Sequence, residues 1–347
     1  MKASISSSTF QAMKPRILLS MGDYNGIGPE IIMKSFSEKP DDSSVIIAAG
    51  HEKIFEFYRK NLSIDTELNL IKNIKEAKSG ALNIFNTISA DDIDIQPGSL
   101  TKHAGKSSMK TIKKILNLCL DGQADAMVTA PISKEAIHLG GYNYPGHTEF
   151  LAELSGSADY LMMLVSGDLR VALTTIHVPV SEVPRLISES LILQKLRILH
   201  ESLKFDFKIS KPKISVLGLN PHAGDGGVIG REELDIIAPA LQKANLNDID
   251  ASGPHSADSF FGSGEYKKYD AILAMYHDQG LIPFKTLSFG SGVNFTAGLP
   301  VVRTSPDHGT AYNIAGQNKA DYRSFTAALE LAILLAENKI RSSIIHA

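Results

Sequence analysis

Short apolar runs alternate with longer segments of helical periodicity along most of this chain. The apolar runs have the length of buried strands, and polar or glycine-containing turns follow them. Such alternation predicts α/β layers on a mostly parallel sheet. The expected strands are 17–20, 45–49, 125–130, 171–176, 214–219 and 270–275, and the expected helices include 54–60, 107–120, 181–203 and 325–338.

Composition restricts the class of protein further. The chain has 347 residues, 43% of them hydrophobic, which is enough for one large domain or two compact ones. A formal net charge of −3 does not indicate the basic surface that nucleic-acid binding requires. The single cysteine, Cys119, excludes an intrachain disulfide and fits a reducing cytoplasm. Residues 1–16 lack the apolar stretch of a secretory signal, and no run is long enough to span a membrane, so we expect a frayed tail on a cytoplasmic protein.

Three histidines stand where expected strands end. His177, His222 and His277 each follow an apolar run, far apart in the sequence. Parallel strands present their carboxyl ends at one edge of the sheet, so the three imidazoles can converge there. Three neutral imidazoles with an open position form a catalytic metal arrangement. The alternative is three unrelated histidines that only complete hydrogen bonds.

The stretch from residue 270 to 303 concentrates further polar groups. After His277 it supplies Asp278, Lys285, Asn294 and Arg303. Asp278 and Asp258 are the acidic candidates to orient a ligand histidine or to take a proton. A ligand site at the end of an α/β strand is the functional interpretation, and a structural histidine beside a solvated turn is the alternative.

Turns that open helices are candidate rims of the same cleft. His147 and Thr148 follow Tyr144–Gly146 at an expected helix start, where backbone N–H groups attract anions, although Thr148 could serve only as a cap. The glycine turn at 21–30 is not a G-x-G-x-x-G fingerprint. Gly105-Lys106-Ser107 lacks the earlier glycine of a phosphate-binding loop, so we reject that interpretation.

Seven segments together resemble the 4-hydroxythreonine-4-phosphate dehydrogenase family of pyridoxal phosphate biosynthesis. The similarity extends from about Met21 to the last helix, and Tyr24-Asn25 departs from the Pro-Ala expected in the first glycine turn. The segments are MGDYNGIGPE (21–30), VTAPISK (128–134), YPGHTEFL (144–151), LNPHAGDGGVIGREE (219–233), GPHSADSFF (253–261), YHDQGLIPFK (276–285) and GVNFTAGLPVVRTSPDHGTA (292–311).

The resemblance implies a role for each matching residue. His177, His222 and His277 would bind one divalent metal ion, zinc, cobalt or magnesium. The implied substrate-binding residues are His147, Thr148, Lys285, Asn294 and Arg303. NAD, or NADP, would be the hydride acceptor, and the loop resembling a cofactor site contains His308, Gly309, Thr310, Asn313 and Gly316, although an ordinary glycine turn is the alternative there.

The resemblance also implies the architecture. It predicts an isocitrate/isopropylmalate dehydrogenase-like α/β fold with two α/β/α lobes around a cleft, and a homodimer that shares its metal site. We expect residues 1–130 and 276–347 in one lobe with the NAD loop, and residues 131–275 in the other. No nucleic acid or membrane partner is expected.

The expected reaction is oxidation of 4-phosphohydroxy-L-threonine to 2-amino-3-oxo-4-phosphooxybutanoate, which loses carbon dioxide to give 3-amino-2-oxopropyl phosphate. Asp278, Asp258 and Lys285 are the candidate bases. Three alternatives remain open at this point. They are a related dehydrogenase of phospho-threonate or phospho-erythronate, an acyltransferase on a related fold, and a metal-binding protein without turnover.

Overall fold

A single sheet of twelve strands runs through the molecule, which is described here by a computed structural model for residues 14–38 and 42–345. Most of the predicted N-terminal tail, residues 1–13, lies outside the described residues. The strand order is β3-β4-β2-β1-β5-β12-β11-β6-β7-β10-β8-β9. The strands are β1 (Arg16–Ser20), β2 (Val45–Gly50), β3 (Leu68–Ile71), β4 (Leu82–Asn86), β5 (Ala126–Thr129), β6 (Leu161–Ser166), β7 (Leu169–Leu173), β8 (Ile214–Leu217), β9 (Ala251–His255), β10 (Ala271–Ala274), β11 (Val293–Ala297) and β12 (Val302–Pro306).

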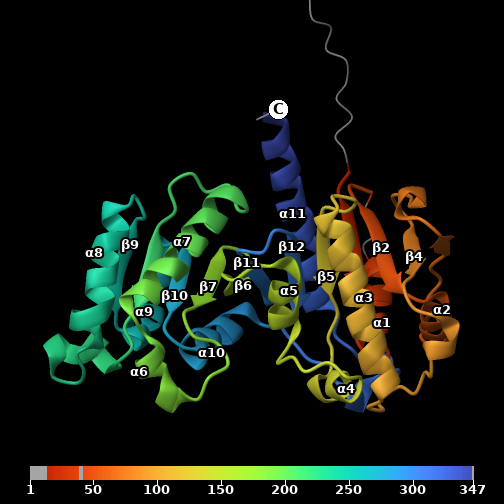
Figure 1. Ribbon diagram of the computed structural model, residues 1–347, viewed down its shortest axis with the longest axis horizontal. Coiled ribbons are helices and arrows are strands. Elements are labelled where there is room, and N and C mark those ends of the chain that lie inside the picture. The colour runs from red at the N-terminus through yellow and green to blue at the C-terminus, as the bar shows by residue number, and fades with distance from the viewer. Residues whose placement is uncertain (1–13, 39–41, 346–347) are drawn as a thin grey trace, which may run out of the picture.

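Antiparallel pairing is confined to the middle of the sheet. The pairs β12–β11, β11–β6 and β6–β7 are antiparallel, and the strand pairs on either side are parallel. The sheet therefore has two parallel wings that are joined through β11 and β6, as Figure 1 shows. This confirms the expected α/β class with a mostly parallel sheet.

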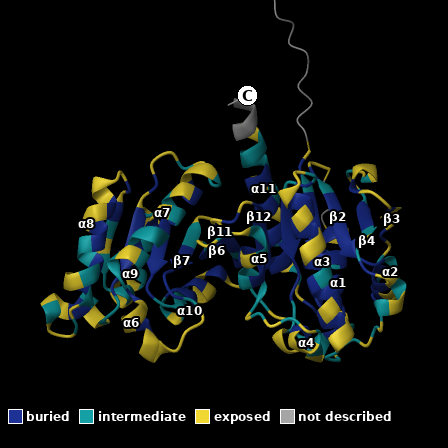
Figure 2. Ribbon diagram, viewed as in Figure 1, coloured by how far each residue is buried: buried dark blue, intermediate teal, exposed yellow. Residues whose placement is uncertain are grey.

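Helices cover the sheet and bury their apolar sides against it. The sheet strands are mostly buried and the outer helix faces are exposed (Figure 2). The helices are α1 (Gly28–Glu38), α2 (Glu52–Asn61), α3 (Lys102–Leu120), α4 (Lys134–Leu139), α5 (His147–Ser155), α6 (Val183–Leu186), α7 (Glu189–Phe205), α8 (Ala238–Leu246), α9 (Ala257–Gly262), α10 (His277–Ser288) and α11 (Arg323–Ile345), with shorter turns η1 (Ile74–Glu76), η2 (Ala90–Asp92), η3 (Val180–Glu182), η4 (Pro221–Gly227), η5 (Glu233–Ile237), η6 (Glu265–Lys268) and η7 (Tyr312–Ile314).

Two sequence expectations differ from the structure in instructive ways. The helix expected over 181–203 is two helices, because the chain is extended at Ser188, whose side chain caps α7 by accepting a hydrogen bond from the Leu191 N–H. The expected strands do not include β9 (Ala251–His255), which pairs with β8. The apolar pattern missed it because a strand at the edge of the sheet need not be apolar on both faces.

The topology supports the proposed convergence of strand ends. β7, β10 and β8 are adjacent and parallel, so the segments that lead to His177, His277 and His222 leave the same edge of the sheet. The division into two lobes at residues 130 and 276 stays a prediction. The predicted division assigns α10 and β11 to the lobe that contains both termini. In the structure, however, α10 contacts β7 and β11 pairs with β6, and both of these strands belong to the other predicted lobe.

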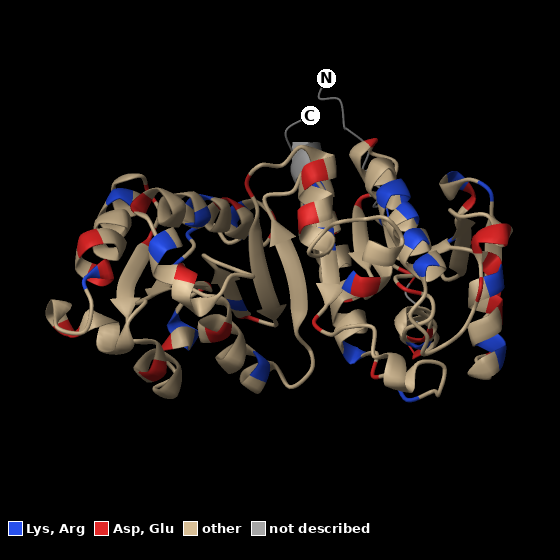
Figure 3. Cartoon of the chain, turned by 60° about the horizontal axis from the view of Figure 1, so that its bottom comes forward, with Lys and Arg blue, Asp and Glu red and all other residues tan. Residues whose placement is uncertain are grey.

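Charged side chains lie mainly on helices and loops, and the strands carry few of them (Figure 3). Among the described residues, no helix has the length and apolarity needed to cross a membrane.

Candidate active site

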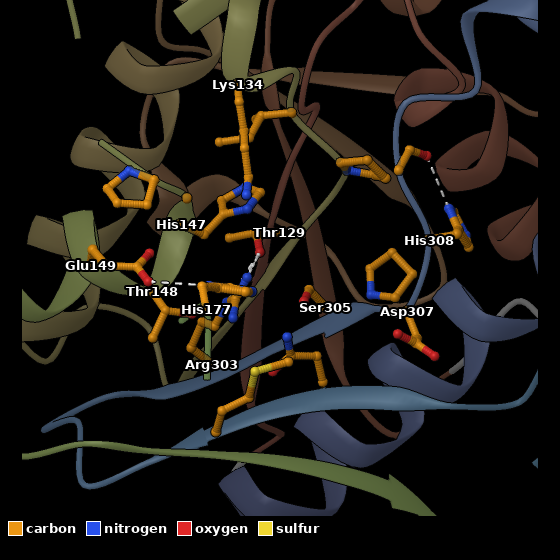
Figure 4. A pocket seen from close by; sticks show the side chains of 18 of the residues that line it. Thr129, Lys134, His147, Thr148, Glu149, His177, Arg303, Ser305, Asp307 and His308 are labelled. Atoms are coloured by element: carbon orange, nitrogen blue, oxygen red, sulfur yellow. Dashed lines mark hydrogen bonds and ion pairs between the residues drawn. The ribbon is translucent and has the colours of Figure 1, made fainter. Parts of the chain in front are cut away.

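A cavity of about 390 Å³ lies where the two wings of the sheet meet. Its wall combines the end of β5, strands β11 and β12, the first turns of α4 and α5, and one side of α10. The cavity brings together nine of the residues proposed from the sequence: His147, Thr148, His177, His277, Lys285, Asn294, Arg303, His308 and Gly309. Segments far apart in the sequence thus form one site, seen from close by in Figure 4.

Arg303 on β12 is the most deeply buried cation of the site. It is 1% exposed, and its Nε and Nη2 donate to Thr129 Oγ1 at 3.1 and 2.8 Å. Its Nη1 donates to Thr296 Oγ1 at 3.2 Å. Burial lowers the pKa of the guanidinium to about 10, and the nearby charge of Glu149 opposes that shift. Hydroxyl partners leave the positive charge without a bonded counterion, so the cavity is suited to an anion.

His147 begins α5 beside that guanidinium. Burial and the charge of Arg303 lower the pKa of His147 well below its usual range, whereas a hydrogen bond with the Ala130 backbone opposes the shift. The imidazole is therefore neutral. Its Nε2 is buried and has no hydrogen-bond partner among the described residues. With Nδ1–H donated to the Ala130 carbonyl, Nε2 presents an acceptor to the cavity.

Two of the predicted metal ligands lie side by side. The rings of His177 and His277 have centroids 5.9 Å apart and an interplanar angle of 41°. His177 Nδ1 lies 3.7 Å from Glu149 Oε1, a contact drawn in Figure 4. His277 Nδ1 lies 2.7 Å from Asp278 Oδ1. Both imidazoles line the cavity, and their donor chemistry suits zinc or cobalt.

His222, the third proposed ligand, does not line the cavity. Within 14–38 and 42–345, no three His, Cys, Asp or Glu side chains lie close enough to hold a metal ion together. His222 belongs to η4, where His222, Ala223 and Asp225 all have positive φ values of 52°, 50° and 44°. Hydrogen bonds from the Ser256 hydroxyl and from the Ser259 backbone lower the pKa of Asp258, and the nearby His222 has a smaller effect in the same direction. The metal centre with three histidine ligands therefore stays a prediction. A single chain brings together two of the three proposed ligands, His177 and His277.

The turn that carries His222 is held by a buried carboxylate. Glu233 is 3% exposed, and its Oε1 accepts hydrogen bonds from the backbone N–H groups of Leu219 and Asn220, both at 2.7 Å. Its Oε2 accepts from Asn220 Nδ2 at 2.9 Å. These bonds compensate the left-handed backbone, which is otherwise unfavourable for residues with a Cβ atom.

The three candidate bases lie in different places. Lys285 lines the cavity, and its Nζ lies 3.2 Å from Asp307 Oδ1. Asp278 contacts His277, and Asp258 accepts from the Ser256 hydroxyl at 2.6 Å; among the described residues, neither carboxylate belongs to the cavity lining.

The proposed cofactor loop is only partly at the cavity. His308 and Gly309 line it, whereas Thr310, Asn313 and Gly316 do not. The Thr310 carbonyl instead accepts from the Ile27 N–H at 3.0 Å, and the Gly316 carbonyl accepts from Asn61 Nδ2 at 2.7 Å.

A partly buried hydrogen bond between a tyrosine and a carboxylate connects this loop to the first glycine turn. The Tyr312 hydroxyl donates to Asp23 Oδ2 at 2.7 Å, and burial raises the pKa of Asp23. The first glycine turn therefore forms a platform for the proposed cofactor loop.

Sequence analysis missed several side chains of the cavity. Glu149, Lys134 and Thr129 belong to the quoted motifs, but each had a simpler interpretation. An acidic residue in the first helical turn is expected from the helix dipole, and a lysine after a capping serine is ordinary surface. Ser133 caps α4 by accepting a hydrogen bond from the Ala136 N–H at 3.2 Å. No local signal marks Asp307 as the partner of Lys285.

Comparison with known proteins agrees with the motifs. The family model of pyridoxal phosphate biosynthetic protein PdxA matches residues 42–332. The 4-hydroxythreonine-4-phosphate dehydrogenases of Prosthecochloris aestuarii and Bacteroides thetaiotaomicron are 46% and 43% identical, over 92% and 94% of this chain and 97% and 90% of theirs. The crystal structure of the Klebsiella pneumoniae 4-hydroxythreonine-4-phosphate dehydrogenase has a TM-score of 0.86 at 36% identity, covering 94% of this chain and 99% of that one. The chain therefore belongs to the PdxA family of pyridoxal phosphate biosynthetic proteins, the 4-hydroxythreonine-4-phosphate dehydrogenases.

Proposed function

We propose that the chain oxidises 4-phosphohydroxy-L-threonine with NAD, or NADP, to 2-amino-3-oxo-4-phosphooxybutanoate, which decarboxylates to 3-amino-2-oxopropyl phosphate. Family membership supports the reaction class. The observation that carries the proposal for this cavity is the buried guanidinium of Arg303 without a bonded counterion. A substrate with a phosphate and a carboxylate supplies the missing negative charge.

The residues of this chain bind and orient the substrate. Arg303, Lys285, Asn294 and Thr148 all line the cavity, and they share the two anionic groups. His147 presents its unpartnered Nε2, which suits an N–H or O–H group of the ligand. Fixed donors around a buried anion hold the reacting carbon in one orientation, which lowers the entropic barrier.

The proposed metal ion is one divalent zinc, cobalt or magnesium ion. His177 and His277 would hold it, with His222 as the third ligand. When bound, such an ion acts as a Lewis acid on the substrate hydroxyl. The loop residues His308, Gly309, Thr310, Asn313 and Gly316 would hold the nicotinamide cofactor, which would supply the hydride acceptor.

Lys285 is the proposed proton acceptor, because it is the candidate that lines the cavity. Lys285 takes the proton of the substrate hydroxyl as hydride leaves the carbon that carries this hydroxyl. The new keto group then accepts the electron pair of the breaking carbon–carboxylate bond. Asp307 holds the resulting ammonium of Lys285, which can return a proton to carbon after carbon dioxide leaves.

We propose a cytoplasmic homodimer in which each site takes residues from both subunits. The single buried Cys119 supports a reducing compartment. The position of His222 away from the cavity lining supports a shared site, because a second copy can supply the missing imidazole.

The test is NADH formation by the purified protein. With 4-phosphohydroxythreonine and NAD, absorbance at the reduced-nicotinamide band should rise. Exhaustive chelation should abolish the rise, and added zinc or cobalt should restore it. Full activity after verified metal removal would refute the metal-dependent reaction. Turnover of phospho-threonate or phospho-erythronate, with none of the amino acid, would replace the proposed substrate.

A further inference from the structure

Strained backbone follows the part of the proposed cofactor loop that lines the cavity. His308 and Gly309 are lining residues, and Ala311, two residues further on, is left-handed, with φ 43° and ψ 53°. A residue with a Cβ atom keeps this conformation only where its surroundings hold it there, and such residues gather at sites that clamp ligands. The loop is therefore expected to be held by contacts outside itself.

Two hydrogen bonds to the first glycine turn flank Ala311. On one side, the Thr310 carbonyl accepts from the Ile27 N–H at 3.0 Å. On the other side, the Tyr312 hydroxyl donates to Asp23 Oδ2 at 2.7 Å. The strained residue thus lies between two contacts with the same turn, and only the second of them depends on a side chain of the loop.

Asp23 is the fixed end of that second hydrogen bond. It is fully buried, and its Oδ1 accepts from the Asn25 N–H at 2.9 Å. The Asp23 N–H donates to the carbonyl of Pro131, a residue of the cavity wall, also at 2.9 Å. The turn and this wall are in close contact, because a Cβ atom at Gly22 would lie 2.4 Å from the same carbonyl oxygen. Asp23 therefore connects the cavity wall to the loop.

The hydrogen bond between Tyr312 and Asp23 is costly to break. Burial, and then the charge of Asp23, raise the pKa of Tyr312, whereas a hydrogen bond with the Ser133 side chain opposes that shift, so the hydroxyl stays a donor. Burial also raises the pKa of Asp23, and the hydrogen bond from Tyr312 is the largest effect in the opposite direction. Without the hydroxyl, a buried carboxylate oxygen would lose its donor.

The cavity end of the loop offers an atom to a ligand. His308 Nε2 is buried and has no hydrogen-bond partner among the described residues. A Cβ atom at Gly309 would meet none of the described atoms within 4 Å, so a ligand can approach the backbone there. Figure 4 shows His308 apart from His177 and Glu149, toward the other end of the cavity. This end is suited to a second ligand beside the one that the proposed metal ion would hold.

We propose that Tyr312 is a positioning residue for the nicotinamide cofactor, because its hydrogen bond to the buried Asp23 carboxylate holds the 308–316 loop in the shape that presents His308 and Gly309 to the cavity. The inference rests on the proposed function, of which the cofactor is a part. Tyr312 is not among the described lining residues, so it acts through the loop and not by touching the substrate. It gives Tyr312 and Asp23 roles that the resemblance does not assign.

The first measurement is hydrogen–deuterium exchange of the ligand-free protein, which requires no cofactor and no turnover. Tyr312→Phe removes only the hydroxyl. Amides of the segments 308–316 and 23–28 should exchange faster than in the wild type, since the Ile27 N–H loses a fixed partner when the loop moves. Tyr269→Phe is the control, because the Tyr269 hydroxyl accepts from Ser252 at 3.0 Å, before the start of β10, and the residue is not among the described lining residues. Its exchange should equal that of the wild type in both segments.

The second measurement is calorimetric titration with NAD, in the presence and absence of O-phospho-L-homoserine, which is the proposed substrate without its reacting hydroxyl. Tyr312→Phe should bind NAD about 10-fold more weakly, the loss expected for one hydrogen bond to a charged group. Its affinity for O-phospho-L-homoserine should equal that of the wild type. In turnover, the KM for NAD should rise while the KM for the phosphorylated substrate stays unchanged, a split that general destabilisation does not produce.

A double-mutant cycle tests whether the effect passes through this one contact. Asp23→Asn, Tyr312→Phe and the double variant are titrated with NAD. If the contact is responsible, the second substitution should weaken NAD binding less in the double variant than it does alone. Strictly additive losses would show that the two residues act separately, and would overturn the inference.

The remaining outcomes separate this inference from the proposed function. A wild-type protein that binds neither NAD nor NADP would overturn the proposed function, and the role of Tyr312 in cofactor binding with it. Wild-type binding of NAD with unchanged affinity and unchanged exchange in Tyr312→Phe would overturn the inference alone. Weaker binding of O-phospho-L-homoserine by Tyr312→Phe, with unchanged affinity for NAD, would also overturn it, because the tyrosine would then serve the substrate end of the cavity.

Discussion

Arg303 is the largest side chain that the described chain buries completely. A buried cation whose hydrogen bonds go to threonine hydroxyls is costly in a folded protein unless a ligand supplies the opposite charge. Thr129 accepts from two of its nitrogens, which fixes the guanidinium in place before any ligand arrives. The edge of the Arg303 guanidinium that faces the cavity therefore needs no reorganisation when an anion binds.

The neutral state of the His147 imidazole, whose Nε2 is buried, predicts a pH dependence of stability. Its folded pKa lies well below the usual 6.5, so the unfolded chain binds a proton at a higher pH than the folded chain does. This contribution to stability is present above about pH 6.5 and is lost as the pH falls toward the folded pKa. Urea unfolding of His147→Gln from pH 7.5 to 5.5 should show a weaker fall in the free energy of unfolding than the wild type.

His103→Gln is the control for that experiment, because His103 is exposed on the first turn of α3. Its profile should keep the wild-type slope. Equal slopes for His147→Gln and wild type would contradict a buried neutral imidazole.

At the scale of elements, the contact between α3 and α4 explains why residue 105 is a glycine, for which the sequence alone gives no reason. A Cβ atom at Gly105 would lie 2.0 Å from the Ala136 carbonyl oxygen, which is backbone and cannot move aside cheaply. Gly105→Ala should therefore destabilise the protein by about 1–3 kcal/mol, despite the better helix propensity of alanine. The midpoint of chemical unfolding measures this effect.

Gly262→Ala is the matched comparison, since nothing lies within 4 Å of a Cβ atom at that helical position. It should be neutral or slightly stabilising. A neutral Gly105→Ala would show that α3 and α4 separate easily.

The burial of individual strands explains why some of them could be predicted from the sequence and others could not. Apolar runs located β1, β2, β5, β8 and β10, because strands covered on both faces read as continuous hydrophobic segments. They gave no signal for the short edge strand β3, which is largely half-buried or exposed. The pattern of strand ends singled out His177 and His277, which both line the cavity, whereas the carboxylates beside them depend on how α5 and α10 pack.

At the scale of the whole molecule, the position of His222 predicts a subunit-shared site that mixing can detect. His222→Ala and Lys285→Ala homodimers should each be inactive. If each site combines His222 of one subunit with Lys285 of the other, a mixed dimer contains one site with both residues intact. Unfolding and refolding the two variants together should therefore restore NADH formation.

The control mixes Lys285→Ala with Arg303→Ala, since both residues line the cavity of a single chain. That mixture should stay inactive if the two residues act from the same subunit. Absence of recovery in the first mixture, with mixed dimers verified by mass, would contradict the shared site.

The uninterrupted hydrogen bonding from β5 through β12, β11 and β6 has a consequence for how the enzyme can move. Many two-winged enzymes swing about a flexible connector when they engulf a ligand. Here the connector is itself β-structure, so a large swing would have to rupture ladder bonds. We therefore expect small torsions of the strands and local adjustment of the helix-opening turns at His147 and His277, so that substrate capture tightens the site within a nearly rigid frame.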